Sequence, residues 1–389
     1  MNKVDIVVYG ATGFTGRLVA EYLHKQYGNG NGLTWAMAGR SADKLQQVRD
    51  EMCLPVDTPL IVADAEDADS MQQMVDGAKL ILTTVGPYQL YGSELVGMCA
   101  KSGADYVDLC GEPFWMREMI EAHEQAAKES GARIVFSCGF DSIPSDLGVF
   151  KLQNHAIAKT GSPCSDIEGL VRQMKGTFSG GTAASLQASV KAAKSNPEIL
   201  KLAFDHYSLV PGFKGVEQPD GDTIRYADDY KSWVAPFVMA AINTRNVHRS
   251  NALLGFPYGE DFTYSEMILT GPGEQGEAIA NHIKNDRTMA GPDAPKPGEG
   301  PSKEEREAGH YDIMYVGTLK DGTKSIVSVK GDRDPGYGST SKMISESAIC
   351  LVQDAIDTPA GIWTTAPAMG EKLMKRLEDN AGLVFAVEA

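Results

Sequence analysis

The sequence lacks the features of a chain that binds nucleic acid, spans a membrane or is secreted. Basic residues are few: 36 Lys and Arg stand against 52 Asp and Glu, a formal net charge of −16. A chain this acidic does not attract the anionic backbone of DNA or RNA. The longest apolar run, residues 233–242, is too short to span a bilayer, which takes about 20 residues. A strand-like run begins at residue 4, so no secretory signal is expected.

Cysteine is also scarce. The six cysteines form no Cys-x-x-Cys pair, and the seven histidines are scattered. We therefore expect neither a disulfide framework nor a metal site, and we expect the cysteines to be small buried residues of a cytoplasmic protein. The hydrophobic content of 42% and charged content of 23% are typical of a globular protein and exclude collagen, coiled coil and bulk disorder.

Up to residue 140, strand-like and helix-like runs alternate. Strands are expected at residues 4–9, 34–38, 60–63, 80–85, 106–109 and 133–137. Helices are expected between them at residues 15–27, 42–51, 70–75, 93–102 and 114–130. Short apolar runs suit strands buried on both faces, and the alternation suits helical crossovers. This pattern predicts an α/β fold with a Rossmann-type, doubly wound parallel sheet.

The pattern changes after residue 141 and predicts a mixed α/β second domain. Residues 166–174 suit a strand, and Ser179-Gly-Gly-Thr182 leads into a helix. Lys320-Asp-Gly-Thr323 between two strand-like runs predicts a hairpin. Residues 285–309, with four prolines, are expected to form a surface loop, either a linker or a lid. Within it, Ser302 and Glu305 predict a capping box.

Gly10-Ala-Thr-Gly13-Phe-Thr-Gly16 follows the first strand and opens the first helix. Gly10 allows a sharp turn, Gly13 a close approach to a pyrophosphate, and Gly16 close packing of the helix on the sheet. The helix N-terminus offers free N–H groups, and two threonine hydroxyls add donors. The alternative is a tight turn without a ligand.

The end of the second strand indicates which dinucleotide binds. An NAD site places Asp or Glu there for the ribose hydroxyl, whereas this chain has Arg40, Ser41 and Lys44. A guanidinium would pair with a 2′-phosphate, so we predict NADP. The alternative is that Ser41 only caps the next helix and Arg40 is solvated.

Two further strand ends fall where ligands of such sheets bind. Asp64 ends the third strand, and residues 83–88 end the fourth, where Gly86 and Pro87 shape a loop beside the nicotinamide half. For each, the alternative is a simple turn. The cofactor-contacting residues expected from all these segments are Gly10, Thr12, Gly13, Phe14, Thr15, Gly16, Arg40, Ser41, Lys44, Asp64, Val85, Gly86, Pro87 and Tyr91.

Several segments together resemble the saccharopine dehydrogenase-like oxidoreductases, in particular the bacterial branch that includes trans-acting enoyl reductases. The segments are Gly-Ala-Thr-Gly-Phe-Thr-Gly-Arg, Ala-Gly-Arg-Ser, Val85-Gly-Pro-Tyr88, Tyr91-Gly, Tyr106-Val-Asp-Leu-Cys-Gly-Glu112, Cys138-Gly-Phe-Asp-Ser-Ile-Pro-Ser-Asp146 and Asp334-Pro-Gly-Tyr-Gly. The resemblance covers nearly the whole chain. It implies an NADP-binding domain at residues 1–145, an inserted substrate or dimerisation domain at 146–334, and a segment at 335–389 that returns to the first domain. It leaves the substrate open.

Three functions compete. The first is NADPH-dependent reduction of an activated C=C bond on an apolar or lipid-like substrate. The second is a saccharopine-type reaction at a C–N bond, which needs converging cations in the pocket. The third is a non-catalytic NADP-binding protein, a partner for lipid surfaces or for another enzyme. Apolar residues 233–242 and 253–258 favour the first, although both stretches also suit ordinary core. The scattered cations of the middle domain are Arg172, Lys175, Arg225, Arg245 and Arg249.

Reduction of a C=C bond needs a hydride and a proton. Tyr88 and Asp141 follow strands at the cofactor's reactive end, so they are the candidate catalytic residues, with Tyr91, Ser142 and Glu112 behind them. The alternatives are a core aromatic for Tyr88 and a helix N-cap for Asp141. We also expect a cytoplasmic homodimer that makes at most peripheral membrane contact.

Overall fold

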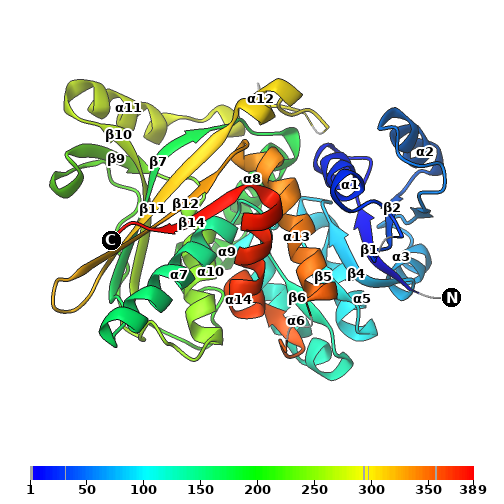
Figure 1. Cartoon of the computed structure of the whole chain (residues 1–389), viewed down its shortest axis with the longest axis horizontal. Coiled ribbons are helices and arrows are strands. Elements are labelled where there is room, and N and C mark those ends of the chain that lie inside the picture. The colour runs from blue at the N-terminus through cyan, green and yellow to red at the C-terminus, as the bar shows by residue number, and fades with distance from the viewer. Residues whose placement is uncertain (1–2, 31, 292–293, 297, 355–356) are drawn as a thin grey trace.

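The computed structural model describes residues 3–30, 32–291, 294–296, 298–354 and 357–389. Within these residues the strands form two sheets of seven strands each, which lie side by side with helices around and between them (Figure 1). The first 135 residues supply six strands of one sheet, and the middle of the chain supplies most of the other.

The first sheet is parallel throughout, as the alternating pattern predicts. Its strands lie in the order β13 (Gly361–Trp363), β6 (Arg133–Val135), β5 (Asp105–Val107), β4 (Ala78–Thr83), β1 (Val4–Tyr9), β2 (Trp35–Gly39) and β3 (Leu60–Val62). Apart from β13, this is the Rossmann order, in which the direction of winding reverses between β1 and β4. The predicted fold class is confirmed.

Alternating residues of each strand enter different cores because successive side chains point to opposite faces. On β1, Ile6 and Val8 belong to one core cluster and Val7 and Tyr9 to the other. The helices of this domain are α1 (Phe14–Tyr27), α2 (Ala42–Glu51), α3 (Ala68–Asp76), α4 (Tyr88–Tyr91), α5 (Ser93–Ser102) and α6 (Pro113–Ser130). α1 shares the first cluster with a late helix, α13 (Thr340–Gln353), whereas α3, α5 and α6 share the second.

The second sheet is mixed. Its order is β14 (Leu383–Val387), β12 (Lys324–Gly331), β11 (His310–Thr318), β7 (Asp166–Lys175), β10 (Thr263–Gly271), β9 (Ser232–Pro236) and β8 (Arg225–Ala227). Only the β7–β10 pair is parallel among the described strands of this sheet. β11 and β12 form the predicted hairpin, with Thr318 opposite Lys324.

The remaining helices lie on the second sheet or between the two sheets (Figure 1). They are α7 (Ile143–Thr160), α8 (Gly180–Ser195), α9 (Pro197–Phe204), α10 (Ala240–Leu253), α11 (Gly273–Asn285), α12 (Lys303–Ala308) and α14 (Thr365–Arg376), with the short turns η1 (Asp228–Tyr230), η2 (Thr288–Ala290), η3 (Pro335–Ser339) and η4 (Leu377–Ala381). None of the helices in the described ranges has an apolar stretch long enough to cross a membrane.

The last part of the chain contacts both sheets. β13 pairs with β6 at the edge of the first sheet, and β14 pairs with β12 at the edge of the second. Figure 1 shows the C-terminus on the second sheet and the N-terminus at the far side of the first. α13 lies between them, so both sheets share one continuous core cluster.

The predicted strands 80–85, 106–109 and 133–137 run too far at their carboxyl ends. β4 ends at Thr83, β5 at Val107 and β6 at Val135. The residues that follow leave the ladder to form loops, and Ser137 takes a positive φ of 58°. Val85, Leu109 and Phe136 in these loops are buried or half-buried at the edge of the sheet, which explains the strand-like pattern without strand pairing. The carboxyl edge is therefore built from irregular, buried backbone.

Candidate active site

The glycine loop has the geometry of a pyrophosphate cradle. Gly10 has φ of 89°, and a Cβ there would lie 2.7 Å from Val85 Cγ2. A Cβ on Gly16 would lie 2.1 Å from the Gly10 carbonyl oxygen, whereas one on Gly13 would meet only that oxygen, at 3.2 Å. Gly10 and Gly16 are therefore fixed by packing, and Gly13 faces the space where a ligand would lie.

The N-terminus of α1 is free to bind an anion. Gly13 is its N-cap, no side chain caps the helix, and its first turn holds no acidic residue. The first amides of a helix have no intrahelical acceptor and carry partial positive charge. Arg17 donates from Nε to the Thr12 carbonyl oxygen at 3.3 Å, which fixes the loop from behind. The residues present thus fit a dinucleotide phosphate.

Arg40 lies at the end of β2, exposed and next to the glycine loop. A Cβ on Gly39 would lie 3.8 Å from Thr12 Cγ2, so the two segments touch. Burial raises the pKa of Tyr9 to about 12, and the charges of Asp64 and Arg40 also act on its hydroxyl, so both side chains lie near the end of β1. Ser41 caps α2 by accepting from the Lys44 N–H at 3.3 Å, which the alternative interpretation anticipated.

The loop after β4 is held by Glu112. This carboxylate is 1% exposed and accepts from the N–H groups of Tyr88 at 2.9 Å and Gln89 at 3.0 Å, and from Gln89 Nε2 at 3.0 Å. It therefore takes up donors at the start of α4, where helix N–H groups lack partners. These contacts make Glu112 a positioning residue for the start of α4, which directly follows Gly86 and Pro87.

Tyr88 is a buried aromatic with its hydroxyl engaged. Its ring lies 5.6 Å from that of Trp115, and the side chain is 4% exposed. The hydroxyl accepts from the Leu109 N–H at 3.0 Å and donates to the Thr83 carbonyl oxygen at 3.4 Å. These contacts link the ends of β4 and β5, so the geometry favours the structural alternative for this candidate. Tyr91, by contrast, is 47% exposed on the outer side of α4.

Asp141 is half-buried in the loop after β6. Its carboxylate lies at the strand edge, because Cβ atoms on Gly139 and Gly111 would come within 2.9 and 3.8 Å of its oxygens. Burial raises its pKa to about 7. Burial raises the pKa of Asp108, Cys110 and Cys138, and the Asp141 charge raises each a little further, so the four side chains lie on the same edge.

Asp141 does not cap a helix. α7 begins at Ile143 with Ser142 as its N-cap, and no side chain caps it. Ser142 instead donates to Asn243 Oδ1 at 3.1 Å and accepts from Asn246 Nδ2 at 2.6 Å, so its hydroxyl is held by α10 in the interior. A half-buried carboxyl group at the cofactor edge with a pKa of about 7 can hold a proton at neutral pH.

The second sheet's domain contributes α8 to this edge. A Cβ on Gly86 would lie 3.4 Å from Ser185 Oγ, and Gln89 Nε2 donates to Ser189 Oγ at 3.3 Å. At the start of α8, Thr182 bonds the Tyr337 hydroxyl at 2.8 Å. The Tyr337 ring in turn packs edge-on against Phe14 of the glycine loop, 5.1 Å between centroids.

Phe140, the residue before Asp141, belongs to a cluster of aromatic rings. The Phe140 ring lies 4.9 Å from that of Tyr311 and 6.4 Å from that of Phe237, all edge-to-face. Phe237 belongs to the apolar stretch 233–242, which runs from β9 to the first residues of α10. This stretch is therefore core that also reaches the residue next to Asp141.

Most of the cationic side chains considered as partners of an amino-acid substrate already bond other groups of the protein. Arg172 bonds Asp312 and Glu388, and Arg225 bonds Glu168. The buried guanidiniums of Arg245 and Arg249 donate to backbone carbonyls of Ala203, Leu209 and Ile362. None of these four can converge on a substrate carboxylate without breaking those contacts.

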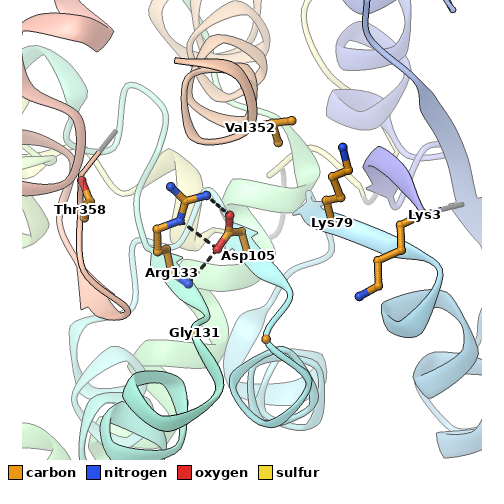
Figure 2. Close-up of a pocket in the computed structure, with 8 residues that line it drawn as sticks. Lys3, Lys79, Asp105, Gly131, Arg133, Val352 and Thr358 are labelled. Carbon is orange, nitrogen blue, oxygen red and sulfur yellow. Dashed lines mark hydrogen bonds and ion pairs between the residues drawn. The ribbon is translucent and has the colours of Figure 1, made fainter. Parts of the chain in front are cut away.

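A pocket of about 480 Å³ lies on the opposite edge of the first sheet (Figure 2). Lys3, Lys79, Asp105 and Arg133, at or next to the starts of their strands, line it, and the Arg133 guanidinium is held by Asp105. Gly103 and Gly131 there end α5 and α6 in the left-handed conformation, so the negative ends of two helix dipoles face this edge. Ligands of parallel sheets bind at the carboxyl edge, so this pocket is not the candidate active site.

The sequence patterns did not single out the residues that the second domain brings to the glycine loop. Tyr337, Thr182 and Ser185 are more than 150 residues distant from Phe14 along the chain, and no local spacing links them. Only the stretch Asp334-Pro-Gly-Tyr-Gly marked Tyr337, and it did so through the family resemblance rather than through a physical pattern.

Comparison with known proteins agrees with this geometry. Residues 6–135 match the family model of the saccharopine dehydrogenase NADP-binding domain, which confirms NADP as the cofactor. A Mycobacterium tuberculosis protein, provisionally named a trans-acting enoyl reductase, is 39% identical over 404 residues, covering 97% of this chain and 96% of its own. The trans-acting enoyl reductase of Mycobacterium ulcerans is 36% identical over 413 residues, covering 99% and 98%.

Among solved structures, the apo histidine-tagged saccharopine dehydrogenase (L-Glu forming) from Saccharomyces cerevisiae is similar over 99% of this chain and 100% of its own. The TM-score is 0.56 and the sequence identity 10%. At that identity the likeness concerns the fold alone, a Rossmann domain with a second α/β domain.

Proposed function

The chain belongs to the family of trans-acting enoyl reductases and is an NADP-dependent oxidoreductase, and from this premise we propose that it reduces an activated C=C bond in an apolar, lipid-like substrate. The observation that carries the proposal is the placement of Asp141. Its carboxyl group, with a pKa of about 7, lies at the same sheet edge as the glycine loop and beside the aromatic side chain of Phe140.

In this proposal, the residues along the carboxyl edge of the first sheet have separate roles. The bound cofactor supplies a hydride. The glycine loop and the start of α1 hold the pyrophosphate, and Arg40 holds the 2′-phosphate. Glu112 fixes the loop at Gly86 and Pro87, which would form one wall of the nicotinamide site.

Asp141 is the proton donor in this proposal. Hydride addition to one carbon of an activated C=C bond leaves the other carbon to be protonated, and a nearby acid with a pKa close to the working pH does this well. The rings of Phe140, Phe237 and Tyr311 pack on one another next to Asp141 in the chain, and in this proposal they help to keep the site dry. Tyr88 is the weaker candidate because its hydroxyl already bonds backbone groups.

The proposal is tested by following hydride transfer into product. NADPH deuterated at the transferred position is incubated with α,β-unsaturated thioesters of increasing acyl length. We expect NADPH oxidation and a saturated product carrying one deuterium on carbon. NADPH oxidation only with an amino acid and a keto acid, with the deuterium on a carbon bonded to nitrogen, would establish the saccharopine-type reaction instead. Binding of NADPH without transfer to any acceptor would establish a non-catalytic protein.

Arg40→Ser should weaken NADPH binding by about ten- to a hundredfold and leave NADH binding unchanged. The lost contact is a charge-assisted one to the 2′-phosphate, of about 1.5–3 kcal/mol. Lys79→Ser is the matched control, because Lys79 is an exposed cation at the opposite edge of the sheet. Calorimetric titration measures both ligands. Equal losses of NADPH affinity in the two variants would mean that net charge, and not Arg40, selects the cofactor.

We also propose that the protein is a homodimer of the cytoplasm. All six cysteines are free, and five of them are buried. Free thiols suit a reducing compartment. Light scattering at several protein concentrations would test the dimer.

A further inference from the structure

The segment that precedes β11 folds onto the glycine loop. A Cβ on Gly300 would lie 2.6 Å from the Phe14 ring, so residue 300 packs directly on that ring. The Glu299 carbonyl oxygen accepts from the Gly180 N–H at 3.0 Å, which ties the segment to the start of α8. The predicted capping box at Ser302 and Glu305 is present and begins α12. Figure 1 shows α12 between the second sheet and α1.

This segment places a guanidinium beside the cradle. Arg306 Cζ lies 5.6 Å from the centre of the Phe14 ring, and Nη1 donates to the Pro301 carbonyl oxygen at 2.6 Å. Phe14 is the first residue of α1, so its N–H is one of the amides that face a bound phosphate. Across the described ranges of the chain, no carboxylate lies within ion-pair distance of the Arg306 guanidinium. Asp334 is its acidic neighbour: burial raises the pKa of that carboxyl group, and the charge of Arg306 opposes this shift.

A guanidinium without an ion-pair partner belongs to a minority in this chain. Most of its described arginines bond a carboxylate, and acidic residues outnumber basic ones by 52 to 36. Among the described arginines the exceptions are Arg40, Arg245, Arg287 and Arg306, and of these Arg40 and Arg306 lie next to the glycine loop. A cation that keeps free N–H donors next to uncapped helix amides is suited to an anion that arrives from solution.

We propose that Arg306 is a cofactor-binding residue that completes the pyrophosphate site from the second domain. The proposal rests on the proposed function, since it takes NADP as the ligand. In the complex, the α1 amides and the Arg306 guanidinium would both hold the pyrophosphate, and the bound cofactor would link the Rossmann domain to residues 299–306. Residues 299–306 are then a clamp on the cofactor rather than a linker.

The test separates pyrophosphate contacts from 2′-phosphate contacts. Arg306→Met keeps an unbranched side chain on the Phe14 ring and removes the charge. It should weaken NADPH and NADH binding by the same factor, about tenfold or more, and leave adenosine 2′-monophosphate binding unchanged. Arg40→Ser should show the reverse pattern, with NADPH and adenosine 2′-monophosphate weakened and NADH unchanged.

Two controls keep the result specific. Lys303→Met removes a neighbouring exposed cation of α12 and should bind all three ligands like the parent. Arg306→Lys should recover part of the lost affinity. Parent-like NADPH binding by Arg306→Met overturns the proposal, as does an equal loss for all three ligands, which indicates a disturbed fold. If the parent protein binds no NADPH, the proposed function itself fails, which is a different outcome.

Discussion

Asp141→Asn should slow turnover by about a hundredfold or more while NADPH affinity changes little. A positioned general acid contributes roughly 10²–10⁴ to a rate, and an amide at this position cannot give up a proton to a carbanionic carbon. The side chain keeps its size, so the packing against Gly139 and Gly111 is retained. Steady-state kinetics with the unsaturated thioester, together with NADPH titration, measure the two effects separately.

The pH dependence of kcat/KM gives an independent test of Asp141 as the proton donor. Burial raises the pKa of Asp141 to about 7, so the protonated, donating form is present below that pH and is lost above it. The parent's kcat/KM should therefore be level at low pH and fall tenfold per pH unit above about 7. The Asp141→Asn variant should have no such descent. If the variant retains the parent's descent, another group donates the proton.

Tyr88→Phe is the matched comparison. It keeps the ring on Trp115 and removes the hydroxyl that accepts from Leu109 and donates to Thr83. We expect the free energy of unfolding to fall by about 1 kcal/mol, with turnover within a fewfold of the parent. A large loss of turnover at unchanged stability would restore Tyr88 as the proton donor.

The regular part of the fold follows from local patterns. The helices expected at residues 42–51 and 93–102 have those bounds in the structure, because polar and apolar residues there alternate with the helical period. The glycine loop was predictable for a similar reason. Its glycine spacing, the preceding strand and the following helix all lie within one short stretch. The atoms that a Cβ at Gly10 or Gly16 would clash with also belong to this sheet edge.

The site's other half depends on contacts that no local pattern records. Phe14, Tyr337 and Arg306 come from three separate segments and meet only because the second domain packs on the first. Tyr88 shows that a local pattern can also suggest a catalytic role where the contacts in space favour a structural one. Its position after a strand suggested chemistry, but its neighbours in space, Trp115 and Leu109, use its ring and hydroxyl for structure.

Gly13→Val should abolish measurable NADPH binding, an affinity loss of at least about a hundredfold, in a protein that still folds. Gly13 has φ of −77° and ψ of 170°, which a valine can adopt, and its Cβ would crowd only the Gly10 carbonyl oxygen at 3.2 Å. The branched side chain would then occupy the space through which the pyrophosphate reaches the α1 amides.

Gly16→Ala is the contrasting variant, because its Cβ would lie 2.1 Å from the same oxygen and should destabilise the fold itself by about 1–3 kcal/mol. Denaturant unfolding without cofactor and thermal unfolding with NADPH distinguish the two, since a ligand that binds only the folded state raises the midpoint. NADPH should raise the midpoint of the parent and not that of Gly13→Val. A folded Gly13→Val protein that NADPH stabilises as it does the parent would place the pyrophosphate elsewhere, and the cofactor-binding roles proposed for Arg40 and Arg306 beside this loop would then be wrong as well.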